Sequence, residues 1–170
     1  ADLGTEYKES ITRFGVEHTV CDLVRDDPGW NAEFDVVVMC EVVEHLPVPP
    51  HIVLEKVLRW IRPGGLLFLT TPNLYRLRNS IRLLIGMPVF FVFRYPVVGC
   101  SIGHPLEYSK EHLKWHLREA GFERIETKLM QMSNRGFTPQ AVVARLMMAP
   151  LYIRPIWRDG LVASARRASK

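Results

Sequence analysis

Two apolar runs in the first half of the chain predict buried strands. Residues 34–40 read FDVVVMC and residues 66–72 read LLFLTTP, so both runs are apolar on both faces. Such runs are typical of a parallel sheet that is covered by helices. Between them, Pro49 and Pro50 suit the first turn of a helix. Apolar residues then recur at helical spacing, at Ile52, Val53, Val57, Leu58 and Ile61.

The residues after this helix predict a turn. Pro63 disfavours helix at Arg62, and two glycines follow it, so we expect the helix to end before the turn and the second strand to begin at residue 66. The remaining pattern predicts a helix after the N-cap Ser109, and the order of strands and helices indicates an α/β protein. The further expected elements are strands at 18–23, 122–130 and 160–167 and helices at 75–86, 110–120 and 138–153.

Composition narrows the class of protein. The 170 residues are 48% hydrophobic and 24% charged, with a net charge of +4 and no block of like charges that would indicate a nucleic-acid-binding tail. Cys21, Cys40 and Cys100 have no paired spacing, so we expect reduced thiols in a cytoplasmic protein rather than disulfides or a zinc site. The longest apolar patch, residues 83–93, is broken by a glycine and a proline and is shorter than the roughly 20 residues that span a bilayer.

Four phrases resemble one known family, the class I S-adenosylmethionine-dependent methyltransferases. They occur in the family's order: CDL at 21–23, FDVVVMCEVVEHL at 34–46, RPGGLLFLTTPN at 62–73 and GHPLEYSKEHLKWHLREAGF at 103–122. The resemblance implies a Rossmann-like mixed sheet with helices on both faces and an antiparallel strand near one edge. It also implies S-adenosylmethionine as the cofactor. Sequences that share the phrases PNLYRLRN and GHPLEYS look like tailoring methyltransferases of glycan and secondary-metabolite pathways.

The resemblance assigns cofactor contacts to five residues. Asp2 matches the acid that accepts hydrogen bonds from the ribose hydroxyls, as acids do in Rossmann dinucleotide sites. Asp22 matches the residue that meets the adenine amino group, and Leu23 supplies an apolar wall. Cys40 and Glu41 are expected beside the methionine portion.

One part of the family pattern is absent. The glycine-rich turn after the family's first strand has no counterpart here, so we expect an amino-terminally truncated domain that spans residues 1–170. A cap insertion is expected at about 74–103, where Phe90, Phe91, Phe93 and Tyr95 could cover the acceptor, form plain core or make a dimer contact. Four arginines are interleaved with this segment: Arg76, Arg78, Arg82 and Arg94. They could bind a phosphate-bearing substrate or anionic lipid, or they could simply keep the helix soluble.

Glu41, Glu44 and His45 admit three interpretations. Glu44 and His45 could fix the loop to the next helix by hydrogen bonds. Alternatively, His45, with His104 as a second candidate, could accept a proton from the acceptor, because an imidazole has an ordinary pKa of about 6.5. The four side chains together could also hold a divalent cation, as a similar arrangement does in small-RNA 2′-O-methyltransferases. We favour the general base, because metal-free relatives carry the same motif and the chain lacks an extended basic surface for RNA.

The sequence thus predicts methyl transfer to an oxygen of a small molecule, a glycan or a lipid-linked precursor. No nucleic-acid partner is expected, and peripheral membrane contact is compatible with the sequence. His112 and His116 lie one turn apart without an accompanying carboxylate motif, so we expect them on a solvated helix face. The alternatives are a metal-dependent RNA methyltransferase and a non-catalytic interaction module.

Overall fold

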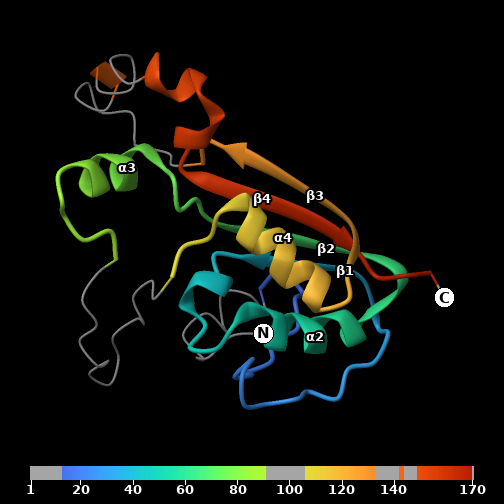
Figure 1. The fold of residues 1–170 in the computed structure, drawn as a ribbon. Helices are drawn as coiled ribbons and strands as arrows, with labels where there is room; N and C mark the ends of the chain where they lie inside the picture. The colour runs from blue at the N-terminus through green and yellow to red at the C-terminus, as the bar shows by residue number, and fades with distance from the viewer. Residues whose placement is uncertain (1–12, 91–105, 133–141, 144–148, 170) are drawn as a thin grey trace.

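The computed structural model describes residues 13–90, 106–132, 142–143 and 149–169, and these residues form a mixed α/β sheet with helices (Figure 1). The sheet has the order β1-β2-β4-β3, in which β1 and β2 are parallel and β4 is antiparallel to both of its neighbours. The predicted mixed sheet is therefore confirmed. In chain order the elements are β1 (Phe34–Cys40), η1 (Val43–His45), α2 (Pro50–Trp60), β2 (Ile61–Pro72), α3 (Leu77–Leu84), α4 (Lys110–Glu119), β3 (Glu123–Met130), η2 (Leu151–Ile153), η3 (Pro155–Trp157) and β4 (Gly160–Arg166).

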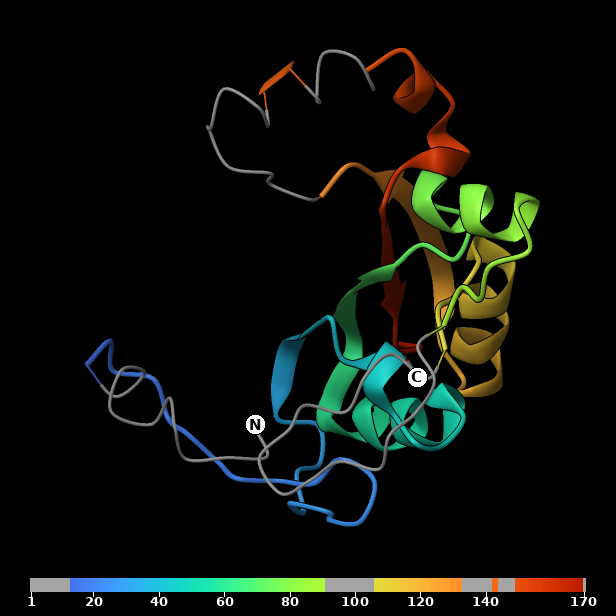
Figure 2. The same ribbon diagram turned by 90° about the vertical axis from the view of Figure 1, so that its left-hand side faces the viewer.

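Helices α2 and α4 pack against each other on one face of the sheet (Figures 1 and 2). Leucines from both helices and from the central strands β2 and β4 close the core between these layers. The fully buried ones are Leu54, Leu67, Leu69, Leu113, Leu117 and Leu161. Ser109 caps α4 as the sequence predicts, because its hydroxyl oxygen accepts a hydrogen bond from the backbone N–H of His112 at 3.2 Å.

The first strand is less buried than its sequence predicts. Met39 points into the core, whereas Val36 is 50% exposed and Val38 is 60% exposed. β1 is the edge strand of the described sheet, and no element of the described part of the chain covers the face that carries these two valines. The run is apolar on both faces, but burial on each face depends on what packs there.

The second strand begins earlier than predicted. Ile61 is not the last residue of α2 but the first of β2, where it pairs with Phe34. The pairing then jumps to Val36 and Leu66, so the proline and glycines expected in a free turn form an irregularity within the strand. Gly64 adopts a φ of +78°, a conformation that costs glycine little.

Two other expectations have different outcomes. The strand expected at 18–23 is wrong, because Val20 has only a single bridge and residues 23–25 form a turn. The helix expected at 138–153 lies mostly outside the described residues, and its end is the short 3-10 helix η2. Nowhere in the described ranges is there a helix that is both long enough and apolar enough to cross a membrane.

Candidate functional site at the ends of the two parallel strands

The carboxyl ends of β1 and β2 bring polar side chains together, as expected for ligand sites in open α/β sheets. Glu41 follows the last residue of β1 and is tied to Thr70 of β2 twice. Its backbone N–H donates to the Thr70 carbonyl at 3.0 Å, and its Oε1 accepts from the Thr70 hydroxyl at 2.9 Å. Glu41 has a φ of +53°, which is uncommon for a residue with a side chain. Cys40 beside it is exposed. The chain therefore turns sharply out of the strand at this point.

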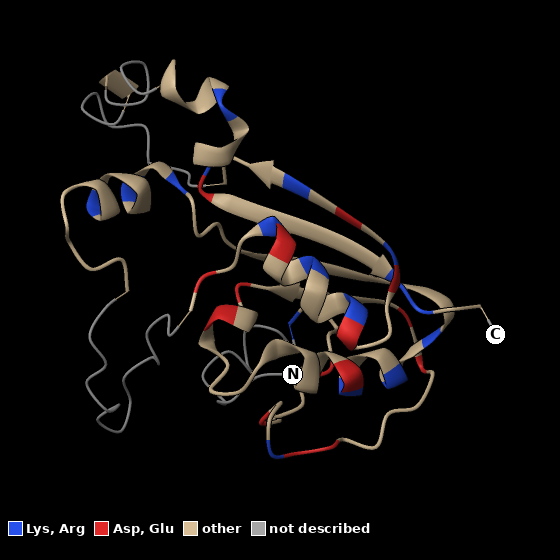
Figure 3. Cartoon of the chain, viewed as in Figure 1, with Lys and Arg blue, Asp and Glu red and all other residues tan. Residues whose placement is uncertain are grey.

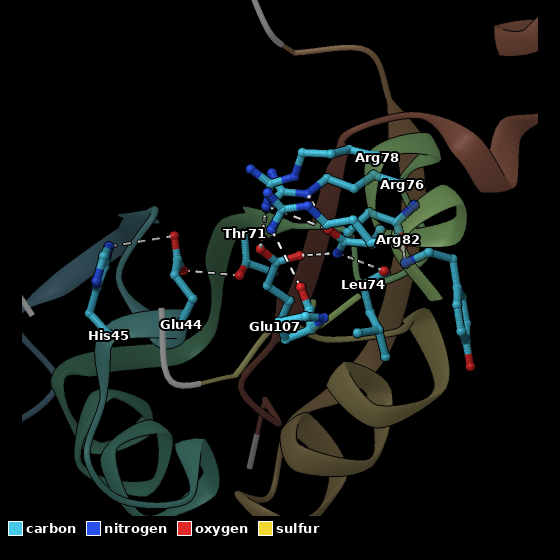
Figure 4. A network of polar contacts seen from close by, with 12 residues as sticks. Glu44, His45, Thr71, Leu74, Arg76, Arg78, Arg82 and Glu107 are labelled. Carbon is cyan, nitrogen blue, oxygen red and sulfur yellow. Dashed lines mark hydrogen bonds and ion pairs between the residues drawn. The ribbon is translucent and has the colours of Figure 1, made fainter. Parts of the chain in front are cut away.

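Glu44 lies in η1 and is fully buried. Its Oε2 accepts a hydrogen bond from the Thr71 hydroxyl at 2.9 Å (Figure 4). Its Oε1 has no hydrogen-bond partner among the described residues and lies 3.9 Å from Nε2 of His45. Burial raises the pKa of the Glu44 carboxyl from 4.5 to about 7, although the Thr71 hydroxyl opposes the shift. Glu44 can therefore gain or lose a proton near neutral pH.

His45 lies between this carboxyl group and solvent. Its side chain is 35% exposed, whereas that of Glu44 beneath it is inaccessible. A partly exposed imidazole next to a buried carboxyl group can accept a proton from a bound molecule, and the carboxylate can stabilise the imidazolium that forms. Tyr108 is also buried nearby, and burial together with the charge of Glu44 raises the pKa of its phenol to about 12. Tyr108 therefore stays protonated.

A second buried carboxyl group, Glu107, is held by α3. Arg76 forms an ion pair with its Oε1, and a nitrogen of Arg78 lies 3.9 Å from the same oxygen. The Asn79 amide donates to Oε2 at 2.6 Å and to the Leu74 carbonyl at 2.9 Å. Both oxygens of Glu107 are thus satisfied, as a buried carboxylate requires. This network (Figure 4) fixes α3 next to the segment that leads into α4.

The loop that carries Asp22 is organised by its own turn. Asp22 Oδ1 accepts from the backbone N–H groups of Val24 at 2.9 Å and Arg25 at 3.3 Å. Lys56 of α2 anchors this turn by donating to the carbonyls of Leu23 at 3.3 Å and Val24 at 2.7 Å. Leu23 is partly buried against the core. Asp22 therefore has a structural role as a turn cap, and its side chain is still 34% exposed.

A family comparison identifies this type of domain. The family model described as a methyltransferase domain matches residues 6–127. The chain belongs to the methyltransferase domain family. The class I fold and the enzyme class expected from the four phrases are confirmed. No curated protein sequence matches the chain.

Solved structures of methyltransferases share the fold. A SAM-dependent methyltransferase from Archaeoglobus fulgidus is 17% identical with a TM-score of 0.57, and the match covers 98% of this chain and 74% of that one. One from Mesorhizobium loti is 17% identical with a TM-score of 0.59 and coverages of 98% and 78%. Phosphoethanolamine N-methyltransferase 2 of Haemonchus contortus, solved with S-adenosyl-L-methionine, is 15% identical with a TM-score of 0.51 and coverages of 88% and 36%. At these identities the similarity is one of fold.

Several expected residues of the methyltransferase lie outside the described part of the chain. Asp2, His104 and the cap residues from 91 to 103 belong to this group, so the roles assigned to them stay predictions. Within the described ranges, no three His, Cys, Asp or Glu side chains converge as metal ligands would.

The solvated helix face expected for the two histidines of α4 is wrong for one of them. His112 is exposed, but His116 stacks on His51 with ring centroids 5.4 Å apart, and their Nδ1 atoms are 3.2 Å apart. Burial, and next the proximity of His51, lowers the pKa of His116 to about 4. His116 contacts Tyr108 edge-on as well, with ring centroids 5.6 Å apart, so it is a packing residue.

Sequence reasoning missed three contributors to the site. Thr70 and Thr71 are in one of the four phrases, yet only the fold shows that they face Glu41 and Glu44. The sequence signal that could have identified them is a pair of hydroxyl residues at the end of an apolar strand. Asn79 and its partner Glu107 lie in the phrases PNLYRLRN and GHPLEYS, but they are 28 residues apart, so only the fold shows that they are bonded.

Proposed function

We propose that the chain transfers a methyl group from S-adenosylmethionine to an oxygen atom of an acceptor. The acceptor is a small molecule, a glycan or a lipid-linked precursor. The observation that carries the proposal is the partly exposed His45 next to the buried, partly paired Glu44. A hydroxyl group must lose a proton to become a good nucleophile, and this pair supplies a proton acceptor at the strand ends.

The chemistry of the exposed side chains fits the cofactor. Asp22 and Glu41 are open to solvent, so their carboxylate oxygens can accept hydrogen bonds from hydroxyl and amino groups. We assign Asp2, Asp22 and Leu23 to the adenosine portion, and Cys40 and Glu41 to the methionine portion. When bound, S-adenosylmethionine supplies a methyl group made electrophilic by the positive sulfonium.

The residues of the chain perform the proton transfer and the positioning. His45 accepts the proton of the acceptor hydroxyl on its imidazole. The Glu44 carboxylate, with Oε1 at 3.9 Å from Nε2, then stabilises the imidazolium. Thr71 fixes the other oxygen of Glu44, so the carboxyl group keeps its orientation toward His45. His104 is a second candidate base, and the segment 74–103 is assigned as the cap over the acceptor. Alignment of the two reactants provides most of the remaining acceleration.

The acceptor atom is inferred from His45 and not from the solved relatives. The phosphoethanolamine N-methyltransferase of Haemonchus contortus acts on a nitrogen according to its name, and a CurJ domain of the same fold is a carbon methyltransferase. These relatives share only the fold with the chain.

The test uses radiolabelled S-adenosylmethionine with a panel of phenols, glycosides and glycolipids. His45→Ala should lower turnover by about 10² to 10⁴, the usual contribution of a positioned base. Chelator should not change turnover. Loss of activity with chelator, restored by magnesium, would favour the metal-dependent alternative. Retention of turnover in His45→Ala would remove the base assignment.

A further inference from the structure

Exposed apolar side chains gather on and just after α3. Leu84 is 86% exposed, and four others between residues 81 and 87 are each about half exposed. These four are Ile81, Leu83, Ile85 and Met87. The inward side of the same helix is fixed by the buried Leu77 and by the hydrogen bond from the Asn79 amide to Glu107. The outer side of α3 is therefore apolar although the helix is firmly attached.

A second apolar set lies on η2 and η3. Leu151 and Ile156 are exposed, and Ile153 is 75% exposed. Both sets belong to the same end of the sheet, because Pro72 at the end of β2 pairs with Gly160 at the start of β4. Figures 1 and 2 show α3, η2 and η3 at this end.

A direct contact joins the two sets. The side-chain amide of Asn73, just before α3, donates to the carbonyls of Ile156 at 2.8 Å and Arg158 at 2.7 Å. We call this combined surface the basic apolar end. Its members are Ile81, Leu83, Leu84, Ile85, Met87, Leu151, Ile153 and Ile156, with the arginines Arg76, Arg78, Arg82, Arg154 and Arg158.

The charge on this end is mainly positive, and Asp159, just before β4, already accepts hydrogen bonds from the Gln131 amide at 3.0 Å and the Met132 backbone N–H at 2.6 Å. Residues 73–90 and 149–158 contain five arginines and no aspartate or glutamate (Figure 3). Glu107 lies beneath α3 and offsets one positive charge, while the side chain of Arg78 is still 47% exposed. The Arg154 guanidinium lies 5.4 Å from the Trp157 ring, which adds an aromatic residue with a polar edge to the surface.

A shallow hollow in this end has the same character. It encloses about 540 Å³, and none of the residues that line it is acidic. Met130 and Ile153 supply apolar walls, and the polar groups come from Lys128, Gln131, Tyr152 and Arg158. Neither Glu44 nor His45 contributes to the hollow, so it is separate from the proposed active site.

The combination of groups selects the occupant. Exposed aliphatic side chains among arginines are the pattern of a helix that lies in the interface of an anionic bilayer. The exposed Arg78 and Arg154 can bury the methylene groups of their stems while their guanidinium groups meet lipid phosphates. Arg76 and Arg158 are held by Glu107 and by backbone carbonyls and contribute positive charge. A second copy of the chain is disfavoured, because a two-fold contact through this end would bring arginines together while the nearby Asp159 carboxylate is already bonded to Gln131 and Met132. RNA would use the arginines but would leave the aliphatic side chains in water.

We propose that the basic apolar end docks the protein on a membrane surface that contains anionic lipid. The network of Arg76, Asn79 and Glu107 attaches this surface to the segment that contains Tyr108, the next residue in the chain. If the proposed function is correct, an acceptor with a lipid anchor would reach His45 from the docked face. Vesicle binding itself does not depend on methyl transfer, so the two proposals can fail separately.

The experiment is co-sedimentation of the chain with vesicles. Vesicles of phosphatidylglycerol in phosphatidylcholine should bind the chain, vesicles of phosphatidylcholine alone should bind it much more weakly, and added salt should weaken binding. Leu84→Glu should reduce binding about tenfold or more, because it removes apolar contact and adds a negative charge. Arg78→Gln and Arg82→Gln should each reduce binding about fivefold.

Ile52→Glu is the matched control, since Ile52 is a 43% exposed aliphatic residue on α2 outside the basic apolar end. It should bind vesicles as the unmodified chain does, and circular dichroism should show all variants folded. Equal binding by Leu84→Glu and the unmodified chain would overturn the proposal. Release from vesicles by inorganic phosphate at the same ionic strength would instead indicate a soluble anion. A dimer that Leu84→Glu dissociates, without vesicle binding, would identify a second copy as the occupant.

Discussion

Replacement of Glu44 by Gln should stabilise the protein at pH 8 and should flatten its stability between pH 5 and pH 7.5. The folded-state pKa of Glu44 is raised from 4.5 to about 7, chiefly by burial. Between these two values the unfolded chain has already lost the proton while the folded chain keeps it. The carboxyl group therefore does not oppose folding at low pH, and it destabilises the fold progressively as the pH rises through this window.

The magnitude follows from the size of the shift. The pKa of Glu44 rises from 4.5 in the unfolded chain to about 7 in the folded chain. Because one pH unit corresponds to 1.36 kcal/mol, the ionised Glu44 lowers the free energy of unfolding at pH 8 by about 3 kcal/mol. Gln keeps an oxygen that can accept from Thr71, but its amide nitrogen takes the place of Oε1, which has no hydrogen-bond partner. An unsatisfied buried donor costs about 1 to 2 kcal/mol. We therefore expect Glu44→Gln to gain about 1 to 2 kcal/mol at pH 8 and to lose about as much at pH 4.

Urea unfolding followed by tryptophan fluorescence at a series of pH values measures this difference. Thr71→Val is the matched control with the opposite sign, because the Thr71 hydroxyl holds the Glu44 pKa down and its removal should steepen the loss of stability with pH. Parallel pH profiles for the unmodified protein and Glu44→Gln would show that Glu44 does not titrate in this window. The reasoning from burial would then be wrong.

Three other measurements test the structure. His116→Gln should reduce the loss of stability on acidification from pH 6.5 to pH 4. The pKa of the partly buried His116 is lowered, so the unfolded chain binds the proton first, and denaturant unfolding should show a difference of about 1 to 3 kcal/mol. Gly65→Ala should destabilise the fold by about 1 to 3 kcal/mol in the same assay, since the new Cβ would lie 2.6 Å from Cγ2 of Ile61. Asp22→Ala should weaken the binding of S-adenosylhomocysteine by about 1 to 3 kcal/mol in isothermal titration, and unchanged affinity would remove Asp22 from the cofactor site.

The order of strands and helices could be read from the sequence because its signals are local. An apolar run bounded by turn residues predicts β1, and the Ser109 cap with Gly121 beyond the helix brackets α4. These features depend on residues within a few positions of each other. These local signals therefore do not depend on how distant parts of the chain fold.

Burial and partners could not be read in the same way. Val36 and Val38 belong to a run that is apolar on both faces, yet they are exposed because exposure is decided by the neighbours of an edge strand. Asp22 was expected at the end of a strand and instead caps a turn, since residues 18–23 have no neighbouring strand in the described sheet. Glu41 and Glu44 were singled out by their position after an apolar strand, and the fold places them beside Thr70 and Thr71; their roles in binding and chemistry stay predictions.

The two buried carboxyl groups near the site differ in how the fold compensates them. Glu107 has an arginine on one oxygen and an amide on the other, and a second arginine lies within 4 Å. Glu44 has one hydroxyl group and an unsatisfied oxygen that faces His45. A carboxyl group that serves structure alone is expected to be fully paired, as Glu107 is. A buried carboxyl group that retains an unpaired oxygen and titrates near neutral pH is instead typical of a functional site. This contrast favours a role for Glu44 and His45 in chemistry and a role for Glu107 in holding α3.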